Sequence, residues 1–594
     1  MGIAERIGLL RREMEREGVD IYIVPSADYH GSEYVGEYFK TRQYLTGFTG
    51  SAGTAVFTRD EAGLWTDGRY FIQAEKELKG TGVRLFRMGE PGTDTIEEFL
   101  ENKLSEGGVI GFDGRVMELD EGERYRKIAE EKKGCVRAEF DFAARFWKDR
   151  PSLPGGPVYI LDEAYAGESV RSKLARIREK MDSYGADVHL LSSLDDIAWL
   201  FNIRGNDVAY CPVTLAFVLL EKDGGMLFVD EKKFPDAVVK MLAENNISIH
   251  PYESVYQAVK ELGGRHVLLD ARRTSYALYH SIPGDALVVK KENPTVLMKC
   301  IKNDTEAANI RKAHLKDGIA HTKFLYWLKT NIGKKRITEL TAAAKLEELR
   351  AEQEGFLGPS FAPISAAGEH GAIVHYSASE ESDAELKEGE LYLSDTGGHY
   401  LEGSTDITRT IALGDVPEKQ KRDFTLVARA MLRLADAVFL HGSSGVTLDV
   451  LAREVFWKER VNFNHGTGHG VGYLLSIHEP PINFRWREGD KPSQIFEENM
   501  VITDEPGIYI EGSHGIRLEN ELLVRQDTEN EYGQFLRFEV LTFVPVDIDA
   551  LLPECMSVQE KEMLNEYHRN VYEQISPYLS GEEKAWLRTA VRPI

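Results

Sequence analysis

The sequence predicts a multidomain protein of α/β and α+β class, with two tandem copies of one α/β module followed by a third domain. Its 594 residues exceed the length at which a single hydrophobic core stops growing. One order of elements occurs twice, and Gly18 and Gly185 occupy matching points of the two copies. Strand-like segments that carry acids and histidines then follow between residues 390 and 519.

The first copy has the order helix, strand, loop, hairpin and helix. An amphipathic helix is expected at 3–17, and an alternating strand that ends in proline is expected at 19–25. A turn-rich stretch leads to a hairpin with strands at 54–58 and 64–70.

The second copy repeats this order after about 160 residues. A helix is expected at 170–184 and strands follow it, with a Gly-Gly turn at 224–225; the apolar segments are 186–191, 197–205, 214–220 and 226–230. The loop of the first copy is about a dozen residues longer. We infer a tandem duplication.

The Pro- and Gly-rich segment 150–157 reads as the linker between the copies. A helix start with Asn303 or Asp304 as its cap opens the third domain. We therefore expect domains at 1–152, 153–302 and 303–594.

Helices of the third domain are expected to continue to about residue 355, and again near 417–440 and 447–459. Two capping boxes, Ser557-x-x-Glu560 and Ser580-x-x-Glu583, predict a pair of helices at the end of the chain.

Composition excludes several function classes. The 72 basic and 97 acidic residues give a net charge of −25, which repels nucleic acid and anionic lipid surfaces. We interpret the net negative charge as a contribution to the solubility of the protein. There is no apolar run of about 18 residues, no secretory signal pattern and no C-x-x-C pair among the four cysteines. We expect a cytoplasmic protein that binds neither nucleic acid nor membranes.

One aspartate ends a strand-like segment and another lies near the start of the next, eleven residues later. Asp395 follows an apolar row, and Asp406 follows a glycine-rich loop and precedes Ile407. This spacing suits a hairpin that brings both carboxylates together across its ladder. Taken alone, the pair favours turn-forming aspartates in a glycine-rich hairpin.

Two glutamates and a glycine-rich histidine loop complete the set. Glu505 ends one strand-like segment, and Glu519 shares another with core residues. In segment 464–473 alternate glycines let the backbone approach a ligand and expose His465 and His469 to it. A solvent-exposed loop is the alternative for that motif alone. Four carboxylates with one imidazole form a donor set for two divalent cations.

These residues resemble the pita-bread metallopeptidases of family M24B, and specifically the three-domain cytosolic aminopeptidase P (Xaa-Pro aminopeptidase) family. The resemblance covers nearly the whole chain, and its motifs are highly specific. The matching segments are 48–53, 65–70, 199–205, 371–376, 395–409, 465–469, 503–507 and 515–520. It implies two creatinase/prolidase-like N-terminal α/β domains before a pita-bread catalytic domain with a helical extension.

The resemblance also implies roles for individual residues. The metal ligands would be Asp395, Asp406, His469, Glu505 and Glu519, with Asp406 and Glu519 bridging two ions. His375 and His478 would line the pocket beside the scissile bond, and His465 would orient substrate or relay protons. Tyr509 and Arg517 would order ligands and substrate from outside the metal sphere. Glu505 would also shuttle a proton to the leaving nitrogen.

The implied activity is hydrolysis, by a metal-bridging hydroxide, of the bond before a proline at position two of a peptide. The ions would be Mn²⁺, with Fe²⁺, Co²⁺ and Zn²⁺ as alternatives. A homodimer through the catalytic domain is implied, in which Trp457 is either a contact or a core residue. Segment 473–477 departs from the family pattern, which leaves the preferred first residue open. A prolidase and a non-catalytic binding module remain as alternatives.

Overall fold

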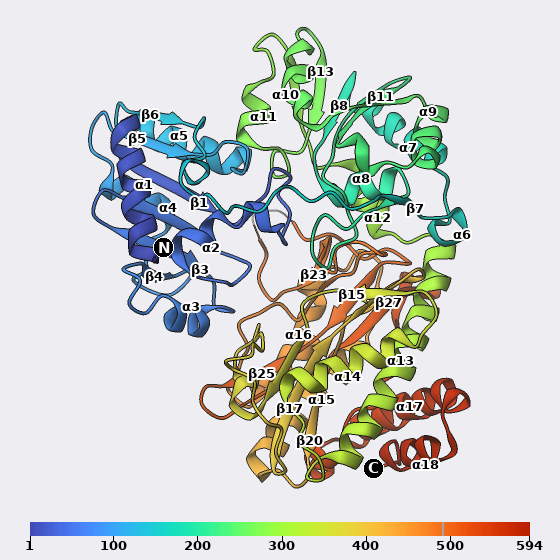
Figure 1. Ribbon diagram of the computed structural model, residues 1–594. Coiled ribbons are helices and arrows are strands. Elements are labelled where there is room, and N and C mark those ends of the chain that lie inside the picture. Colours follow the sequence, from blue (N-terminus) through green and yellow to red (C-terminus); the bar gives the residue numbers. More distant parts are fainter. Residues whose placement is uncertain (490–491) are drawn as a thin grey trace. The chain divides into compact units, whose positions relative to one another are not determined.

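The computed structural model describes residues 1–489 and 492–594, which divide into two compact units (Figure 1). Unit 1 comprises Met1–Leu161 and Glu168–Thr295. Unit 2 comprises Asp162–Gly167 and Val296–Ile594.

Unit 1 contains two six-stranded mixed sheets of one topology. The first sheet has the order β4-β3-β2-β1-β5-β6, and the second has the order β12-β11-β10-β8-β13-β14. In each sheet the first strand in sequence pairs antiparallel with the hairpin and parallel with the strand on its other side. The predicted duplication is confirmed. The strands are β1 Ile21–Pro25, β2 Thr54–Thr58, β3 Ala62–Thr66, β4 Arg84–Arg87, β5 Val109–Phe112, β6 Cys135–Arg137, β8 Val188–Leu191, β10 Phe217–Glu221, β11 Gly225–Val229, β12 Ile247–Pro251, β13 His266–Leu269 and β14 Leu287–Lys290.

The helix that opens each copy ends at one of the two matching glycines. Gly18 follows the first helix with φ 67°, and Gly185 follows the second with φ 66°. This left-handed conformation favours glycine, which explains why the residue recurs at that point. The helices of unit 1 are α1 Ile3–Glu17, α2 Thr41–Thr46, α3 Phe71–Glu77, α4 Ile96–Lys103, α5 Leu119–Glu131, α7 Val170–Ser183, α8 Leu194–Leu200, α9 Asp236–Glu244, α10 Val255–Ala258 and α11 Tyr276–His280.

Two short helices lie where the sequence predicted no helix. Helix α2 lies in the turn-rich stretch of the first copy, and α8 occupies part of the apolar run 197–205. The remainder of that run forms β9 Ile203–Arg204, which pairs with β7 Tyr159–Ile160. An apolar run of this length does not distinguish a buried helix from a buried strand.

In unit 2 the predicted helix starts are confirmed. Asn303, rather than Asp304, caps the first long helix in a capping box with Glu306. Ser557 and Ser580 cap the two terminal helices in the same way. The helices are α6 Glu163–Ala166, α12 Pro294–Cys300, which begins in unit 1, α13 Asp304–Asn331, α14 Glu339–Ala351, α15 Glu418–Ala435, α16 Gly445–Lys458, α17 Val558–Ile575 and α18 Gly581–Ala590.

The strands of unit 2 form one large sheet and several small ones. The six-stranded sheet has the order β21-β28-β27-β24-β22-β23, and a three-stranded sheet has the order β16-β17-β20. Helix α15 buries Phe424, Val427 and Met431 in the core that also contains residues of the large sheet. The strands are β15 Phe356–Pro359, β16 Ile364–Ala367, β17 Glu390–Thr396, β18 Gly398–Tyr400, β19 Gly403–Ser404, β20 Ile407–Leu413, β21 Val438–Leu440, β22 Gly468–Gly470, β23 Glu479–Phe484, β24 Val501–Asp504, β25 Gly507–Ile510, β26 His514–Arg517, β27 Asn520–Asn530 and β28 Gly533–Val540.

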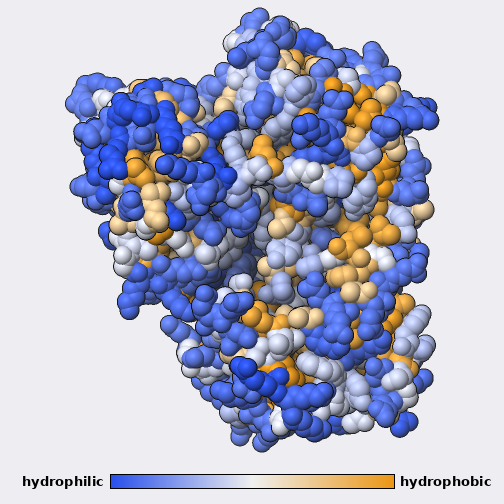
Figure 2. Space-filling model, viewed as in Figure 1, coloured by the Kyte–Doolittle hydropathy of each residue, from blue (hydrophilic) through white to orange (hydrophobic). Residues whose placement is uncertain are grey.

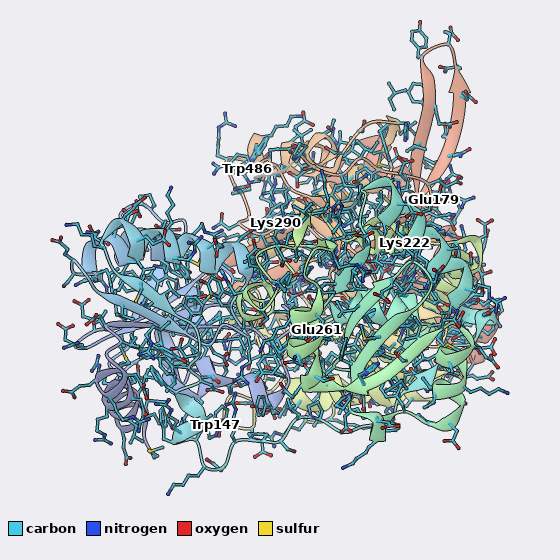
Figure 3. The ribbon with its side chains drawn as sticks, turned by 90° about the horizontal axis from the view of Figure 1, so that it is seen from above. Trp147, Glu179, Lys222, Glu261, Lys290 and Trp486 are labelled. Carbon is cyan, nitrogen blue, oxygen red and sulfur yellow. The ribbon has the colours of Figure 1, made fainter. Side chains whose placement is uncertain are left out.

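The β27–β28 hairpin continues beyond its own sheet, and Figure 3 shows its tip extending away from the strands at its base. Tyr532 at the turn is 75% exposed. The face of the molecule in Figure 2 is mostly hydrophilic, with hydrophobic side chains scattered among the polar ones. Within residues 1–489 and 492–594, no helix combines the length and apolar character needed to cross a bilayer.

Candidate metal centre

The two predicted aspartates lie at the same end of one antiparallel ladder. Strands β17 and β20 pair with Asp395 opposite Thr408 and Thr396 opposite Ile407, so Asp406 immediately precedes the ladder that contains Asp395. Strand β17 is buried on both faces after its first residue. The sequence therefore predicted the hairpin correctly.

Glu519 is joined to this ladder through Thr408. The backbone N–H of Glu519 donates to the Thr408 carbonyl at 3.1 Å, and the Thr408 hydroxyl donates to Glu519 Oε2 at 2.8 Å. Glu519 is 1% exposed. Its position between β26 and β27 thus brings a third carboxylate to the two aspartates.

His469 lies on β22 with one ring nitrogen available as a ligand. Its Nδ1 is 3.0 Å from the carbonyl of Gly470, and because a carbonyl only accepts, Nδ1 carries the proton of the neutral ring. The unprotonated Nε2 lies 3.5 Å from Asp406 Oδ2 and 3.7 Å from Glu505 Oε1. Asp406, His469 and Glu519 each offer a donor atom within 4.8 Å of the others.

The glycines on either side of His469 allow neighbouring strands to pack closely against β22. A Cβ at Gly468 would lie 1.9 Å from the Thr503 carbonyl oxygen, and a Cβ at Gly470 would lie 2.2 Å from the Glu479 carbonyl oxygen. The sequence predicts close approach of a ligand at these glycines. The structure instead shows that neighbouring strands require the space.

Glu505 follows β24, and the histidine loop fixes its backbone. Its N–H donates to the Thr467 carbonyl at 2.8 Å. The ring of His478 lies edge-on to that of His469, with centroids 4.4 Å apart and planes at 88°. His478 and Glu505 therefore both lie beside the His469 imidazole.

A chain of hydrogen bonds links the remaining predicted residues to Asp395. Arg517 forms a buried ion pair with Asp395 and donates from Nη1 to the Tyr509 hydroxyl at 2.8 Å. That hydroxyl lies 2.9 Å from Nε2 of His465, whose Nδ1 faces the Gly466 carbonyl at 2.7 Å. Because Nδ1 must donate to the carbonyl, Nε2 accepts from Tyr509.

His375 is half-buried between two anchored neighbours. The carbonyl of Val374 lies 3.5 Å from Arg517 Nη2, and the Tyr376 hydroxyl donates to the buried Glu339 at 2.8 Å. The structure thus places the segment that carries His375 next to Arg517.

The carboxylates are buried close together, and their negative charges repel one another. Burial, followed by the charges of Asp395, Glu505 and Glu521, holds the pKa of Asp406 well above its usual range. Burial and then Asp406, Glu505 and Asp395 do the same for the pKa of Glu519, and burial raises the pKa of Glu505 as well. Like charges at this density oppose one another unless cations lie between them.

The donor set fits divalent ions. Among the described residues, Asp395 Oδ1 is buried without a hydrogen-bond partner, so this oxygen has room for another interaction. Adjacent ligands of an octahedral ion lie about 3 Å apart at metal–oxygen distances of about 2.1 Å. The 3.5 and 3.7 Å contacts of His469 are close to that spacing. A donor set of carboxylate oxygens with one imidazole suits Mn²⁺ or Fe²⁺. It does not have the thiolate ligands that are typical of a structural zinc site.

Several buried residues behind the predicted ligands are not predicted from the sequence. Glu521 accepts from the N–H of Asp406 at 2.6 Å and lies 3.1 Å from the buried His314. Two Asp–Arg pairs, Asp317–Arg350 and Asp449–Arg453, are also buried next to ligand-bearing segments. The spacing of two residues between Glu519 and Glu521 was a usable signal. The ion pairs had none, because charged residues in helices ordinarily face solvent.

Family models cover most of the chain. Two matches to the creatinase/prolidase N-terminal domain cover residues 6–139 and 149–306. Metallopeptidase family M24 matches residues 308–526, and the C-terminal region of peptidase M24 matches residues 534–594.

Full-length relatives are similar to the chain throughout. Aminopeptidase P2 of Arabidopsis thaliana is 36% identical over 632 residues, which cover 100% of this chain and 89% of the relative. A probable Xaa-Pro aminopeptidase P of Botryotinia fuckeliana is 36% identical, with 99% of this chain and 93% of the relative covered.

Two solved structures mark the extent of the similarity. X-prolyl aminopeptidase of Caenorhabditis elegans, described as a cytosolic enzyme with a di-nuclear active site, has a TM-score of 0.95 at 33% identity and full coverage of both chains. The prolidase of Pyrococcus horikoshii has a TM-score of 0.51 at 27% identity, with 64% of this chain and 99% of that chain covered. The likeness to the prolidase thus includes all but 1% of that chain and leaves about a third of this one unmatched.

Proposed function

Because the chain belongs to the aminopeptidase P family of M24 metallopeptidases, we propose that it is an Xaa-Pro aminopeptidase, which removes the first residue of peptides whose second residue is proline. The observation that carries this proposal is the convergence of Asp406, His469 and Glu519 within 4.8 Å, in a chain that matches these enzymes over its full length.

Two divalent metal ions belong to this centre, and we propose Mn²⁺ as the ion. Asp395, Asp406, His469, Glu505 and Glu519 would hold the pair, with Asp406 and Glu519 shared between the ions. Such ions, when bound, polarise a substrate carbonyl and make water nucleophilic at neutral pH.

We assign the proton transfers to Glu505. Its carboxylate lies 3.7 Å from His469 Nε2, at the edge of the centre, where it can reach both the attacking water and the leaving nitrogen of a bound peptide. In the proposed mechanism Glu505 takes a proton from the attacking water and gives it to the proline nitrogen as the bond breaks.

The remaining site residues orient the substrate. His478 and His375 would donate hydrogen bonds to the carbonyl oxygen on which negative charge develops. His465, held by Tyr509 and through it by Arg517, would position the peptide. A proline nitrogen carries no N–H, so selection must depend on the shape of the ring.

A prolidase is the alternative within the same enzyme class, because it uses the same ligands on dipeptides. The test is to compare the hydrolysis of Gly-Pro and of an Arg-Pro-Pro peptide in the presence of Mn²⁺. We expect cleavage of the longer peptide with release of arginine. Hydrolysis of Gly-Pro alone would identify a prolidase.

A non-catalytic M24 module used for protein binding is the alternative from another class. Such a module has no need of a complete donor set, whereas all five donor residues are present here. Elemental analysis after reconstitution with metal distinguishes a metallopeptidase from a non-catalytic binding module. We expect about two equivalents of metal per chain; an absence of bound metal would favour the binding module.

We propose the three domains 1–152, 153–302 and 303–594, because segment 150–157 links the two copies and Asn303 begins α13. The chain would work in the cytosol, as the C. elegans enzyme is described to do, without nucleic-acid or membrane partners. We also propose a homodimer through the catalytic domain. Trp457 is 40% exposed and contacts the exposed Trp486, which favours an interface residue over a core residue. Sedimentation velocity tests the dimer.

A further inference from the structure

A buried ion pair lies behind the two aspartates of the centre. Arg350 on α14 binds Asp317 on α13 with both of its arms, at 2.7 Å from Nε and 3.1 Å from Nη2, and neither residue is more than 3% exposed. Arg350 Nη2 also donates to the Thr396 carbonyl at 3.1 Å, next to Asp395. Asp317 accepts from the Thr405 hydroxyl, next to Asp406.

The same arrangement recurs behind the histidine loop. Arg453 and Asp449, both on α16, form an ion pair of 2.7 Å with no more than 1% of either residue exposed. Arg453 donates to the His465 carbonyl at 2.8 Å. Asp449 accepts from the Thr467 hydroxyl at 2.5 Å, and the Thr467 carbonyl in turn holds the N–H of Glu505 at 2.8 Å.

Each pair therefore uses its aspartate to hold a threonine and its arginine to hold a backbone carbonyl. Buried ion pairs contribute little to stability compared with apolar side chains of similar volume, because both charges lose their hydration. The two pairs instead hold the backbone segments that carry the predicted metal ligands in place. One fixes the hairpin ends that carry Asp395 and Asp406, and the other fixes the segments that carry His465 and Glu505.

We propose that Asp317–Arg350 and Asp449–Arg453 are two positioning devices, each of which acts mainly on the affinity of one metal ion. The inference rests on the proposed ligand set, in which Asp406 and Glu519 are shared by both ions. Asp395 then belongs to one ion only, whereas His469 and Glu505, 3.7 Å apart, belong to the other. Asp317–Arg350 supports the Asp395 ion, and Asp449–Arg453 supports the His469 ion.

The test is metal binding by full-length double variants that replace each pair with apolar residues, Asp317→Leu/Arg350→Met and Asp449→Leu/Arg453→Met. Metal-free protein is titrated calorimetrically with Mn²⁺, and the electron paramagnetic resonance spectrum reports whether the two ions are magnetically coupled. We expect Asp449→Leu/Arg453→Met to bind the Asp395 ion with the wild-type constant and the His469 ion about 10–100-fold more weakly. Asp317→Leu/Arg350→Met should lose affinity mainly for the Asp395 ion, with a smaller loss for the other ion because Thr405 adjoins the shared Asp406. Both variants should lose the coupled spectrum.

The control is an ion pair of similar burial in unit 1, Asp207–Lys233, with an N–O distance of 2.6 Å. Asp207→Leu/Lys233→Met should bind two ions as the wild type does. If a pair variant does not fold, Thr405→Val and Thr467→Val interrupt the same supports by removing one hydroxyl each. Two wild-type constants in all four variants would overturn the proposal.

Ligand variants identify which ion each pair supports. Asp395→Asn removes the ligand that belongs to one ion. Combined with Asp317→Leu/Arg350→Met it should still bind one ion, whereas combined with Asp449→Leu/Arg453→Met it should bind neither tightly. Equal occupancy in the two combinations would contradict the assignment of each pair mainly to one ion.

Failure of this inference and failure of the proposed function give different results. A wild type that binds two ions but leaves Xaa-Pro peptides intact would disprove the function while the metal titrations still decide the inference. A wild type that cleaves them, with pair variants that keep both ions, would disprove the inference alone.

Discussion

The Tyr509 hydroxyl lies 2.9 Å from Nε2 of His465 and joins that ring to Arg517. Tyr509→Phe removes both hydrogen bonds while the aromatic ring remains. We expect kcat/KM to fall about 10–100-fold, as for other residues that orient a metal site from outside, with two ions still bound. Steady-state kinetics and elemental analysis measure this. Tyr532→Phe, at the exposed hairpin turn, is the control and should behave as the wild type.

Glu519→Gln should abolish activity and leave the fold intact. The substitution removes a charge that both ions would share, so kcat/KM should fall by more than the roughly 100-fold expected from residues outside the metal sphere. Metal content should fall below two equivalents, and the circular dichroism spectrum should not change. Glu529→Gln on the exposed part of β27 is the matched control. Turnover near the wild-type rate would refute the ligand assignment.

His478→Gln should lower kcat far more than it raises KM. If His478 donates to the developing oxyanion, its loss costs about 10²–10³ in kcat, because that bond strengthens in the transition state. The measurement is a Michaelis–Menten analysis on an Xaa-Pro peptide. His441→Gln, on an exposed histidine, should have no effect. A rise in KM alone would show that His478 only binds substrate.

Chelation should lower the thermal stability of the protein, and Mn²⁺ should restore it. The carboxylates with raised pKa must lose protons to bind metal, so the increase in Tm on adding Mn²⁺ should be larger at pH 8 than at pH 5.5. Scanning calorimetry with and without Mn²⁺ at both pH values tests this. An equal increase at both would contradict the crowding of charges.

His568 should make the protein sensitive to acid. Burial, followed by the charge of Arg409, lowers the pKa of His568 to about 3, while its Nε2 accepts from the N–H of Val546. Between about pH 6.5 and 3 the unfolded chain binds a proton at this ring and the folded chain does not. Stability is therefore complete above pH 6.5 and is lost as the pH falls.

His568→Gln keeps an acceptor for Val546 and removes this titration. The wild type should lose stability relative to the variant by up to about 1.4 kcal/mol per pH unit below pH 6.5. Urea unfolding at pH 7.5 and 5.0, in the presence of chelator, measures the difference. A constant difference between the two proteins would show that His568 does not titrate on unfolding.

The sequence predicted the features that depend on local chemistry. Ser557 and Ser580 predict the starts of their helices, because each serine has a glutamate three residues later and the two form a capping box. Gly18 and Gly185 marked the duplication because each ends a helix in the left-handed region. The Asp395–Asp406 hairpin was predictable because the two residues are only eleven positions apart. A connection that short favours antiparallel pairing of the two segments that it joins.

The features that the sequence did not predict depend on partners far apart in the chain. Arg350 meets Asp317 across 33 residues, and nothing near either residue indicates that its charge is buried. Helix α8 lies in an apolar run whose period does not distinguish helix from strand. Glycines 468 and 470 were assigned to a ligand because the neighbouring carbonyls come from other strands.

Strand β27 begins one residue after Glu519 and ends at the hairpin turn, so a single extended segment of roughly 35 Å connects a deeply enclosed acid to bulk solvent. A fluorophore or affinity tag introduced at Tyr532 would be attached through continuous backbone to the reaction centre and yet be too remote to obstruct it. The turn thus provides an anchoring point for immobilising the enzyme with its activity preserved.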